Sequence, residues 1–285
     1  MPEPRTFREE PVSFVRRSGR MSDAQERAFA ELGPHYLLDV PRDVAWTSVH
    51  PEARLDPVAE YGRSADLYVE IGSGQGHAIV SAASSRPGDD FLAVEVFRAG
   101  LARTMLDADR AGARNLRVVE ANAPEVLSSY LPEASAQEVW IFFPDPWHKK
   151  KHTKRRLVRP GFGDTAARAL RDGGLLRLAT DWEDYALQMR EVLDAEPLFE
   201  RAFDGEWADR FDGRVMTAFE RKGIAKGRDI RDLVYRRRAR AGRTCRVPRP
   251  RASASSPLCS CAPQPRRSSC WRSRGWGGCC SPPAS

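Results

Sequence analysis

From residue 67 to about residue 235 the chain alternates short apolar runs with longer amphipathic stretches. Five of the apolar runs have the length and composition of strands: 67–71, 91–95, 116–121, 139–143 and 175–180. The run VWIFF is apolar at every position, as expected of a central strand that is covered on both faces. Strands separated by helical stretches predict an α/β fold with an open, mostly parallel sheet and helices on both faces.

Further elements are expected on either side of this pattern. Ser22 followed three positions later by Gln25 is a capping box, which predicts a helix that ends before Pro34. Residues 35–66 carry turn signals and little periodicity, so we expect an irregular lead-in that lies over the core. Two last strands are expected at the end of the pattern, joined by a turn that contains glycine: 215–221 and 230–235.

The stretch LYVEIGSGQG, residues 67–76, combines a buried strand with a glycine-rich turn. Gly72, Gly74 and Gly76 carry no Cβ atom, so a ligand can approach the backbone closely there. A strand, a glycine turn and a helix N-terminus together make a nucleotide-sized site. The dinucleotide fingerprint needs its third glycine at the position where this chain has His77, so the spacing argues against a dehydrogenase.

Polar residues stand where the apolar runs end. Because ligands of an open parallel sheet bind beyond the carboxyl ends of its strands, these residues are the candidates for a site: Glu70, Glu95, Asn122, Asp145, Thr180 and Asp181. Glu95 lies 19 residues after Gly76, close to the spacing at which an acid reaches the hydroxyl groups of a ribose.

The run FPDPWHKKKHTKRR, residues 143–156, follows the central strand. Two prolines flank Asp145 and restrict the backbone on either side of its carboxylate. Trp147 offers a ring on which a base can stack. Six basic residues follow within nine positions, a cationic run that suits a phosphate backbone: Lys149, Lys150, Lys151, Lys154, Arg155 and Arg156. The combination predicts recognition of one unstacked base on a phosphate backbone.

Composition divides the chain into three parts. The formal net charge is +7, but 12 of the 46 basic residues lie from Arg236 onward, where there is no acid. Residues 1–235 therefore carry 34 basic against 39 acidic residues, so only a local basic patch argues for nucleic acid. We expect a flexible basic arm at 1–20, a folded domain at 21–240 and a disordered tail rich in Ser, Pro, Arg and Cys at 241–285.

The cysteines and the hydropathy bear on the compartment. All six Cys fall in the tail, and their spacing fits no zinc site, so no metal is expected. A body without Cys is consistent with a reducing interior, and we expect a cytoplasmic protein. No apolar run approaches the ~20 residues that a membrane span requires, so no membrane association is expected.

Several motifs together resemble the tRNA (guanine-N7)-methyltransferase family of bacterial type: EIGSGQG, the strand end at Glu95, FFPDPWHKKKHTKRR, ATDWEDY and TAFERKG, with SFVRRSGR near the N-terminus. The resemblance covers about residues 12–238, and PDPWHKK is its most specific part. It implies a Rossmann-like class I methyltransferase fold, with a mostly parallel seven-stranded sheet and an antiparallel edge strand. It also implies S-adenosylmethionine as the cofactor and tRNA as the partner of a protein expected to be a monomer.

The resemblance assigns roles to individual residues. Asp145 would be the catalytic residue. The methyl donor would be held by seven residues: Glu70, Gly72, Gly74, Gly76, Glu95, Asn122 and Asp145. The tRNA guanine would be held by six: Lys149, Asp181, Thr217, Ala218, Phe219 and Glu220. The family commonly has Asp where this chain has Asn122, whose amide oxygen can still accept a hydrogen bond.

Some alternatives stay open at this point. If 217–220 is a regular strand, Thr217 and Glu220 point to opposite faces, so either the strand bends or only one of them touches the base. In the reaction that the resemblance implies, the target is a guanine in the tRNA variable loop, at position 46. The rival interpretations are another Rossmann-like methyltransferase that acts on an amino group of RNA or protein, and an RNA-binding module without catalytic activity.

Overall fold

A computed structural model describes residues 21–240 of this chain. The predictions of a flexible basic arm at 1–20 and of a disordered tail at 241–285 lie outside the described residues. The expected folded domain corresponds to the part that is described.

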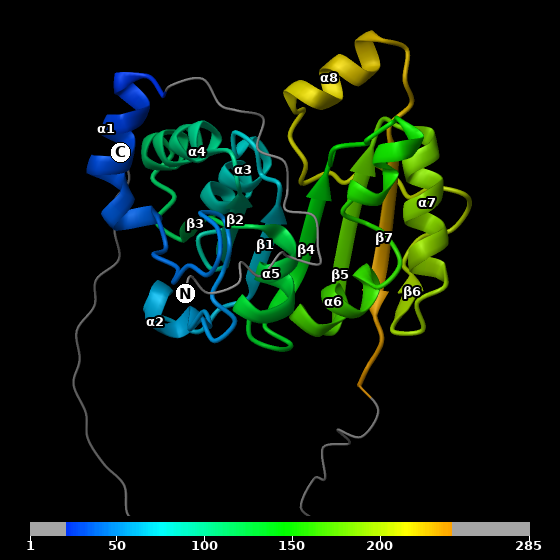
Figure 1. Cartoon of the computed structure of the whole chain (residues 1–285), viewed down its shortest axis with the longest axis horizontal. Helices are drawn as coiled ribbons and strands as arrows, with labels where there is room; N and C mark the ends of the chain where they lie inside the picture. The colour runs from blue at the N-terminus through cyan, green and yellow to red at the C-terminus, as the bar shows by residue number, and fades with distance from the viewer. Residues whose placement is uncertain (1–20, 241–285) are drawn as a thin grey trace, which may run out of the picture. The chain divides into compact units, whose positions relative to one another are not determined.

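The described residues contain a seven-stranded sheet with the order β3-β2-β1-β4-β5-β7-β6 (Figure 1). All neighbouring pairs are parallel except β5–β7 and β6–β7, so β7 alone is reversed and lies one strand in from the edge. The mostly parallel α/β sheet is confirmed. Its strands are β1 (Leu67–Ile71), β2 (Asp90–Glu95), β3 (Leu116–Glu120), β4 (Ala136–Phe142), β5 (Leu170–Thr180), β6 (Phe199–Arg201) and β7 (Arg231–Arg237).

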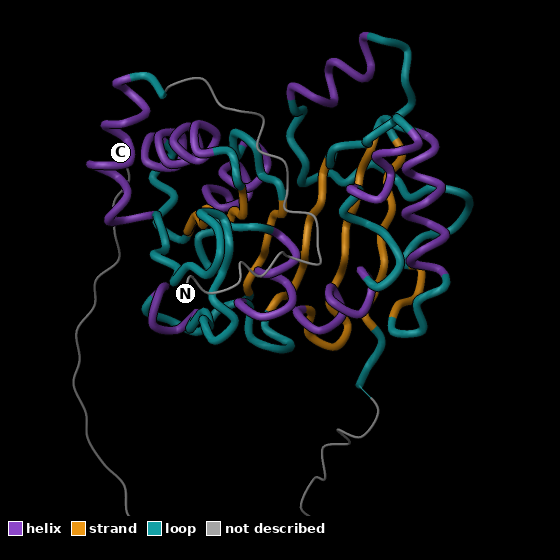
Figure 2. Tube along the Cα trace, in the orientation of Figure 1, coloured by secondary structure: helices purple, strands orange, loops and turns teal. Residues whose placement is uncertain are grey.

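Helices pack on both faces of the sheet (Figure 2). The central strand β4 shows why, because Val139 and Ile141 lie in one buried cluster while Trp140 and Phe142 lie in the other. α6 and α7 cover the face to which Val139 and Ile141 point, and α1, α3 and α4 cover the face of Trp140 and Phe142. The helical segments are α1 (Asp23–Tyr36), α2 (Pro57–Tyr61), α3 (His77–Ser85), α4 (Arg98–Arg110), α5 (Ala123–Glu125), the π-turn η1 (Val126–Tyr130), the 3-10 turn η2 (Lys150–Arg155), α6 (Phe162–Ala169), α7 (Glu183–Asp194) and α8 (Ala218–Ala225).

The prediction that the first helix ends before Pro34 is wrong. The capping box at Ser22 is present, but α1 runs through Pro34 to Tyr36. Tyr36 is 1% exposed and packs in the cluster that contains α4. Burying such a side chain stabilises by about 4 kcal/mol, which is comparable with the ~3 kcal/mol that a proline costs inside a helix.

The prediction of a strand over 215–221 is also wrong, because this segment leads into helix α8. The Thr217 hydroxyl accepts a hydrogen bond from the Glu220 N–H at 3.1 Å and so caps the helix. The β-branched residues of the segment had favoured a strand. The question of which strand face Thr217 and Glu220 occupy therefore does not arise. The seventh strand of the sheet is instead β6, a three-residue segment that pairs only with β7.

The lead-in is irregular, as expected, apart from the short helix α2. Leu38, Val40, Val49 and Leu55 are buried in the main core cluster. The lead-in is therefore part of the domain's core and is fixed along the sheet.

Candidate active site

The strand ends that carry the candidate residues meet at one edge of the sheet. β1 to β5 are parallel, so their carboxyl ends face the same way, toward the end at which α8 lies in Figure 1. From β1 the chain continues first to β2 on one side and later to β4 on the other. This reversal of strand order opens a crevice beside β1, where ligands of such sheets bind.

The glycine turn after β1 has an open side. Gly72, Gly74 and Gly76 have φ angles of +70°, +58° and +75°, values that residues other than glycine rarely adopt. A Cβ atom built on Gly72 or Gly74 would meet nothing within 4 Å, so the backbone there borders free space. A Cβ atom on Gly76 would lie 2.4 Å from Thr104 Oγ1, so the packing of α4 excludes any other residue.

Glu70 is a buried acid below this turn. It is 4% exposed, and its Oε2 accepts a hydrogen bond from the Ile79 N–H of α3 at 3.1 Å. Burial raises the pKa of Glu70 to about 8, with a smaller contribution from the nearby Glu95 and an opposing one from the Ile79 N–H. Near neutral pH the side chain is therefore largely protonated in the free protein.

Glu95, the last residue of β2, holds the glycine turn in place. Its Oε2 accepts from the Gly74 N–H at 2.7 Å, and its Oε1 accepts from the Val96 and Phe97 N–H groups at 2.7 and 2.9 Å. Burial raises the pKa of Glu95, the three N–H groups oppose that shift, and the charge of Asp145 adds to it. Glu95 and Asp145 thus lie close enough to repel each other, as convergent strand ends require.

Asn122 connects this edge to the lead-in. The residue is 3% exposed and stands just before α5. Its N–H donates to the Thr47 carbonyl at 2.7 Å. The segment around Thr47 therefore borders the candidate site, although no sequence motif pointed to it.

The loop that carries Asp145 is strained on both sides of the acid. Phe143 and Trp147 have φ angles of +53° and +42°, and they are two of the three described non-glycine residues with positive φ. Such conformations cost ~1–3 kcal/mol each and persist only where the surroundings enforce them. Two contacts hold this loop: the Arg156 Nε donates to the Pro146 carbonyl at 2.7 Å, and the Phe143 N–H donates to the Ala179 carbonyl at 2.8 Å.

Arg156 is placed differently from the lysines of this run. It is 3% exposed, and it donates to Gln188 at 2.8 Å and to Asp184 at 2.5 Å. Arg156 is therefore a structural member of the cationic run, buried and paired within the protein. Lys149 is exposed, as are three further cations of the run: Lys150, Lys151 and Lys154. Trp147 is partly buried, with the Arg155 guanidinium 5.2 Å from its ring centroid.

The candidate guanine-binding residues lie at the ends of β5 and α8. Asp181 follows β5, and its Oδ2 accepts from Arg228 at 2.7 Å. α8 packs on this acid, since a Cβ atom on Gly223 would lie 2.9 Å from Asp181 Cβ. Phe219 is 63% exposed, and Ala218 beside it is also exposed.

Glu220 is placed differently from its neighbours. It is 1% exposed, and its carboxylate accepts hydrogen bonds from Arg210 at 2.8 Å and from Arg214 at 3.2 Å. Arg214 also pairs with Asp232 of β7. This buried ion cluster ties the first turn of α8 to the sheet.

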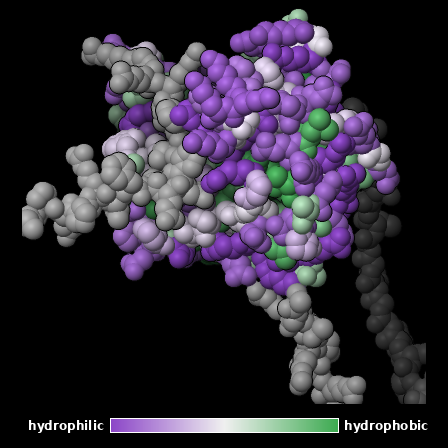
Figure 3. Space-filling model, turned by 45° about the vertical axis from the view of Figure 1, so that its right-hand side comes forward, coloured by the Kyte–Doolittle hydropathy of each residue, from purple (hydrophilic) through white to green (hydrophobic). Residues whose placement is uncertain are grey.

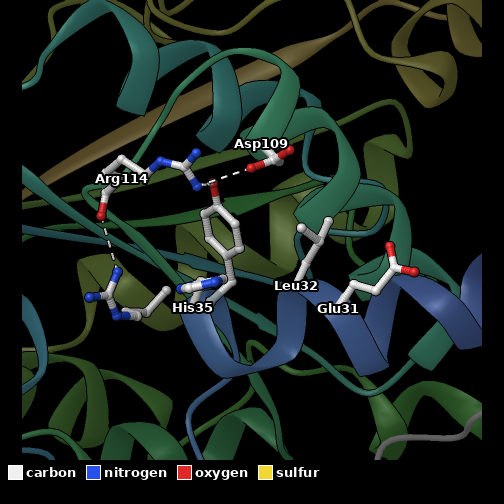
Figure 4. A pocket seen from close by; sticks show the side chains of 7 residues that line it. Glu31, Leu32, His35, Asp109 and Arg114 are labelled. Carbon is white, nitrogen blue, oxygen red and sulfur yellow. Dashed lines mark hydrogen bonds and ion pairs between the residues drawn. The ribbon is translucent and has the colours of Figure 1, made fainter.

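Two surface hollows lie away from this edge. One, of about 450 Å³, is lined by His35 and Leu32 of α1 and by Asp109 and Arg114 near the amino end of β3 (Figure 4). The other is lined by residues of α7 and of the segment before α6. Neither contains a candidate site residue.

Figure 3 shows a mostly hydrophilic face on which a few hydrophobic side chains gather. Within residues 21–240 no group of three or more His, Cys, Asp or Glu side chains is arranged to hold a metal ion. None of the helices described in this range is long and apolar enough to cross a bilayer.

Taken together, the sheet order with β7 alone reversed, the glycine turn after β1 and the acid at the end of β2 define a class I, Rossmann-like methyltransferase fold. Residues 64–233 match a family model described as putative methyltransferase. The tRNA (guanine-N(7)-)-methyltransferase of Paenarthrobacter aurescens (strain TC1) is 44% identical, over 82% of this chain and 93% of the relative. That of Cutibacterium acnes is 47% identical, over 79% of this chain and 83% of the relative. The chain belongs to the tRNA (guanine-N7)-methyltransferase family.

Solved structures resemble the chain more distantly. The 16S rRNA methyltransferase KamB matches with a TM-score of 0.45 at 15% identity, over 63% of this chain and 93% of that chain. A likeness at this level carries no argument about function.

Proposed function

We propose that this protein is a tRNA (guanine(46)-N7)-methyltransferase, which transfers a methyl group from S-adenosylmethionine to N7 of a guanine in the tRNA variable loop. The observation that carries the proposal is the meeting of three acids with the glycine turn, beside an exposed run of lysines. The charge of Glu95 adds to the raised pKa of Glu70, the charge of Asp145 adds to that of Glu95, and the loop after Asp145 carries the lysines. The family membership supports both the reaction and the tRNA substrate.

S-Adenosylmethionine fits the residues at this edge. The open side of Gly72 and Gly74 admits a ligand against the backbone, and Glu95 stands at the distance along the chain that suits a ribose. We assign the cofactor to Glu70, Glu95, Asn122, Asp145 and the glycine turn. When bound there, it supplies a methyl group on a cationic sulfur. The carboxylates of Glu95 and Asp145, together with Glu70 once it has lost its proton, complement its positive charge.

Asp145 has a positioning and electrostatic task. Guanine N7 has a free lone pair in the ring plane, so no proton has to leave before N7 attacks, and no general base is needed. The acid would orient the base and stabilise the positive charge that the guanine acquires. Its place between two strained residues fixes the carboxylate before the substrate arrives.

The substrate side of the crevice is formed by the loop after β4, by Asp181 and by α8. We assign Lys149 to a phosphate or base contact and Asp181 to the guanine. The first turn of α8, Thr217 to Glu220, would complete the pocket, with Glu220 acting through the arginines that bind it. A loop guanine is the expected target, because a paired and stacked base is hard to reach. We place this activity in the cytoplasm and expect a monomer.

The test is methylation of bulk tRNA with labelled S-adenosylmethionine, followed by mapping of the modified nucleoside. The proposal expects N7-methylguanosine at position 46, formed at a greatly reduced rate by an Asp145→Asn variant. Methyl groups on an exocyclic amine, or on protein, would establish one of the rival methyltransferase activities instead. Binding of tRNA without any binding of S-adenosylmethionine in calorimetry would establish a non-catalytic module.

A further inference from the structure

Trp46 is a large aromatic side chain that is exposed and yet held in place. It is 67% exposed, the largest value among the exposed hydrophobic side chains of the described residues. Its indole Nε1–H nevertheless donates to Glu120 Oε1 at 2.8 Å. Glu120 is the last residue of β3 and is 3% exposed. A buried carboxylate therefore fixes the orientation of an indole ring that lies mostly in solvent.

Further contacts fix the same ring. Arg98, at the start of α4, donates to Glu120 Oε2 at 2.7 Å, and its guanidinium lies 5.8 Å from the Trp46 ring centroid. The other side of the loop is held by Ser48, whose hydroxyl accepts from the Asp43 and Ala45 N–H groups at 3.0 Å. Ordering a loop and a large side chain costs conformational entropy, and an indole left in solvent returns little of it. Such an arrangement is expected where the ring meets a ligand.

The position of Trp46 relative to the strand ends indicates which part of a ligand its ring would contact. The glycine turn follows β1, and the acid suited to a ribose, Glu95, ends the neighbouring β2. Glu95 is the register partner of Glu120 on β3, the next strand outward. A nucleoside that lies along this edge with its ribose at β2 places its base at the end of β3. Asn122 and Trp46 stand there, joined by the hydrogen bond between the Asn122 N–H and the Thr47 carbonyl.

We propose that the Trp46 ring forms the aromatic wall of the adenine subsite, oriented by Glu120 and Arg98. This inference rests on the proposed function in that it takes S-adenosylmethionine as the ligand. It adds a binding residue from the lead-in, which no motif marks. The indole face stacks on the adenine ring, while its N–H is already occupied by Glu120 and so makes no contact with the base.

The experiment measures direct binding of S-adenosylhomocysteine and S-adenosylmethionine by calorimetry, without tRNA. Trp46→Ala and Trp46→Leu are expected to weaken both by about 5- to 150-fold, the factor that one base–aromatic stack contributes. Trp46→Phe keeps a ring and is expected to lose less than either. Val44→Ala, in the same loop and 52% exposed, is the matched control and is expected to bind like the wild type. In the methylation assay KM for S-adenosylmethionine rises, while KM for tRNA and the thermal unfolding midpoint stay unchanged.

Two results would overturn the assignment. One is equal binding of S-adenosylhomocysteine by the Leu and Phe variants, because a ring would then give no advantage. The other is an unchanged affinity for S-adenosylhomocysteine with a raised KM for tRNA, which would make Trp46 an RNA contact. If Trp46→Ala does not fold, the comparison of the Leu and Phe variants decides alone. A wild-type protein that binds S-adenosylhomocysteine but does not methylate guanine N7 would refute the proposed function and leave this binding test intact.

Discussion

The buried acid Glu70 makes cofactor binding depend on pH. Its ordinary pKa is 4.5, and burial raises it to about 8, so the free protein holds a proton there at neutral pH. With that pKa, about 1% of the side chain is ionised at pH 6 and about 9% at pH 7. A ligand with a cationic sulfur and an ammonium group favours the ionised carboxylate. Binding should therefore expel the proton.

The size of the pH dependence of binding follows from the ionised fractions of Glu70. If only the ionised form binds, the affinity for S-adenosylmethionine rises about tenfold per pH unit between pH 5.5 and 7.5. In the lower part of this range, up to about pH 6.5, an ordinary α-amino group with a pKa of about 7.7 stays almost fully protonated, so the charge of the ligand is nearly constant there. At pH 6.5 about one proton should therefore be released per ligand bound.

The assay is calorimetry at pH 6.5 in two buffers that differ in ionisation enthalpy, which counts the protons released. Glu70→Gln, of the same shape and always neutral, should bind weakly and with a smaller dependence on pH. An affinity that is flat between pH 5.5 and 7.5, with no proton released, would show that Glu70 is already ionised in the free protein. The argument from burial would then fail.

The same shift has a consequence for stability, with the opposite dependence on pH. A carboxyl whose folded pKa lies above its unfolded value contributes stability that is fully present below about pH 4.5 and is lost as the pH rises through about 8. Glu70→Gln removes this loss. The unfolding midpoint of the variant, relative to the wild type, should therefore increase between pH 5 and 8.

Three further predictions concern the rest of the site. Asp145→Asn should lower kcat by about 100- to 1,000-fold with little change in tRNA affinity, and an unchanged kcat would remove this acid from the reaction. Replacing the three lysines at 149–151 with Gln should reduce the slope of log affinity for tRNA against log salt by about two to three, while an unchanged slope would place the RNA elsewhere. Gly100→Ala puts a Cβ atom 2.2 Å from the Gly74 carbonyl, so it should displace the glycine turn and weaken S-adenosylhomocysteine binding, whereas Gly88→Ala, which meets nothing within 4 Å, should not.

Features that depend on local pattern could be predicted from the sequence. The apolar run of β4 and the glycine turn after β1 are contiguous, and parallel strands place their polar ends together whatever the connections between them. Trp46 could not be recognised, because its partner Glu120 is 74 residues away and only the folded domain brings the two side chains together. Thr217 stands in a segment whose β-branched residues favour a strand, but the segment begins a helix, whose first turn is held by the Thr217 N-cap and by the ion pairs of Glu220 with Arg210 and Arg214.

Arg156, beside the strained loop, allows a test that distinguishes a structural role from a contact with RNA. Arg156 is one of six similar cations in the sequence, but it is the one that donates to the Pro146 carbonyl and pairs with Asp184. Arg156→Lys keeps the charge and loses the planar set of donors that joins these groups. The loop then relaxes toward ordinary φ angles and Asp145 loses its fixed place, so kcat should fall by about tenfold or more, while the salt dependence of tRNA binding stays as in the wild type. A phosphate contact predicts a different pattern for Arg156→Gln, a reduction of the salt slope by about 0.7–0.9 with kcat unchanged, and that result would return Arg156 to the RNA surface.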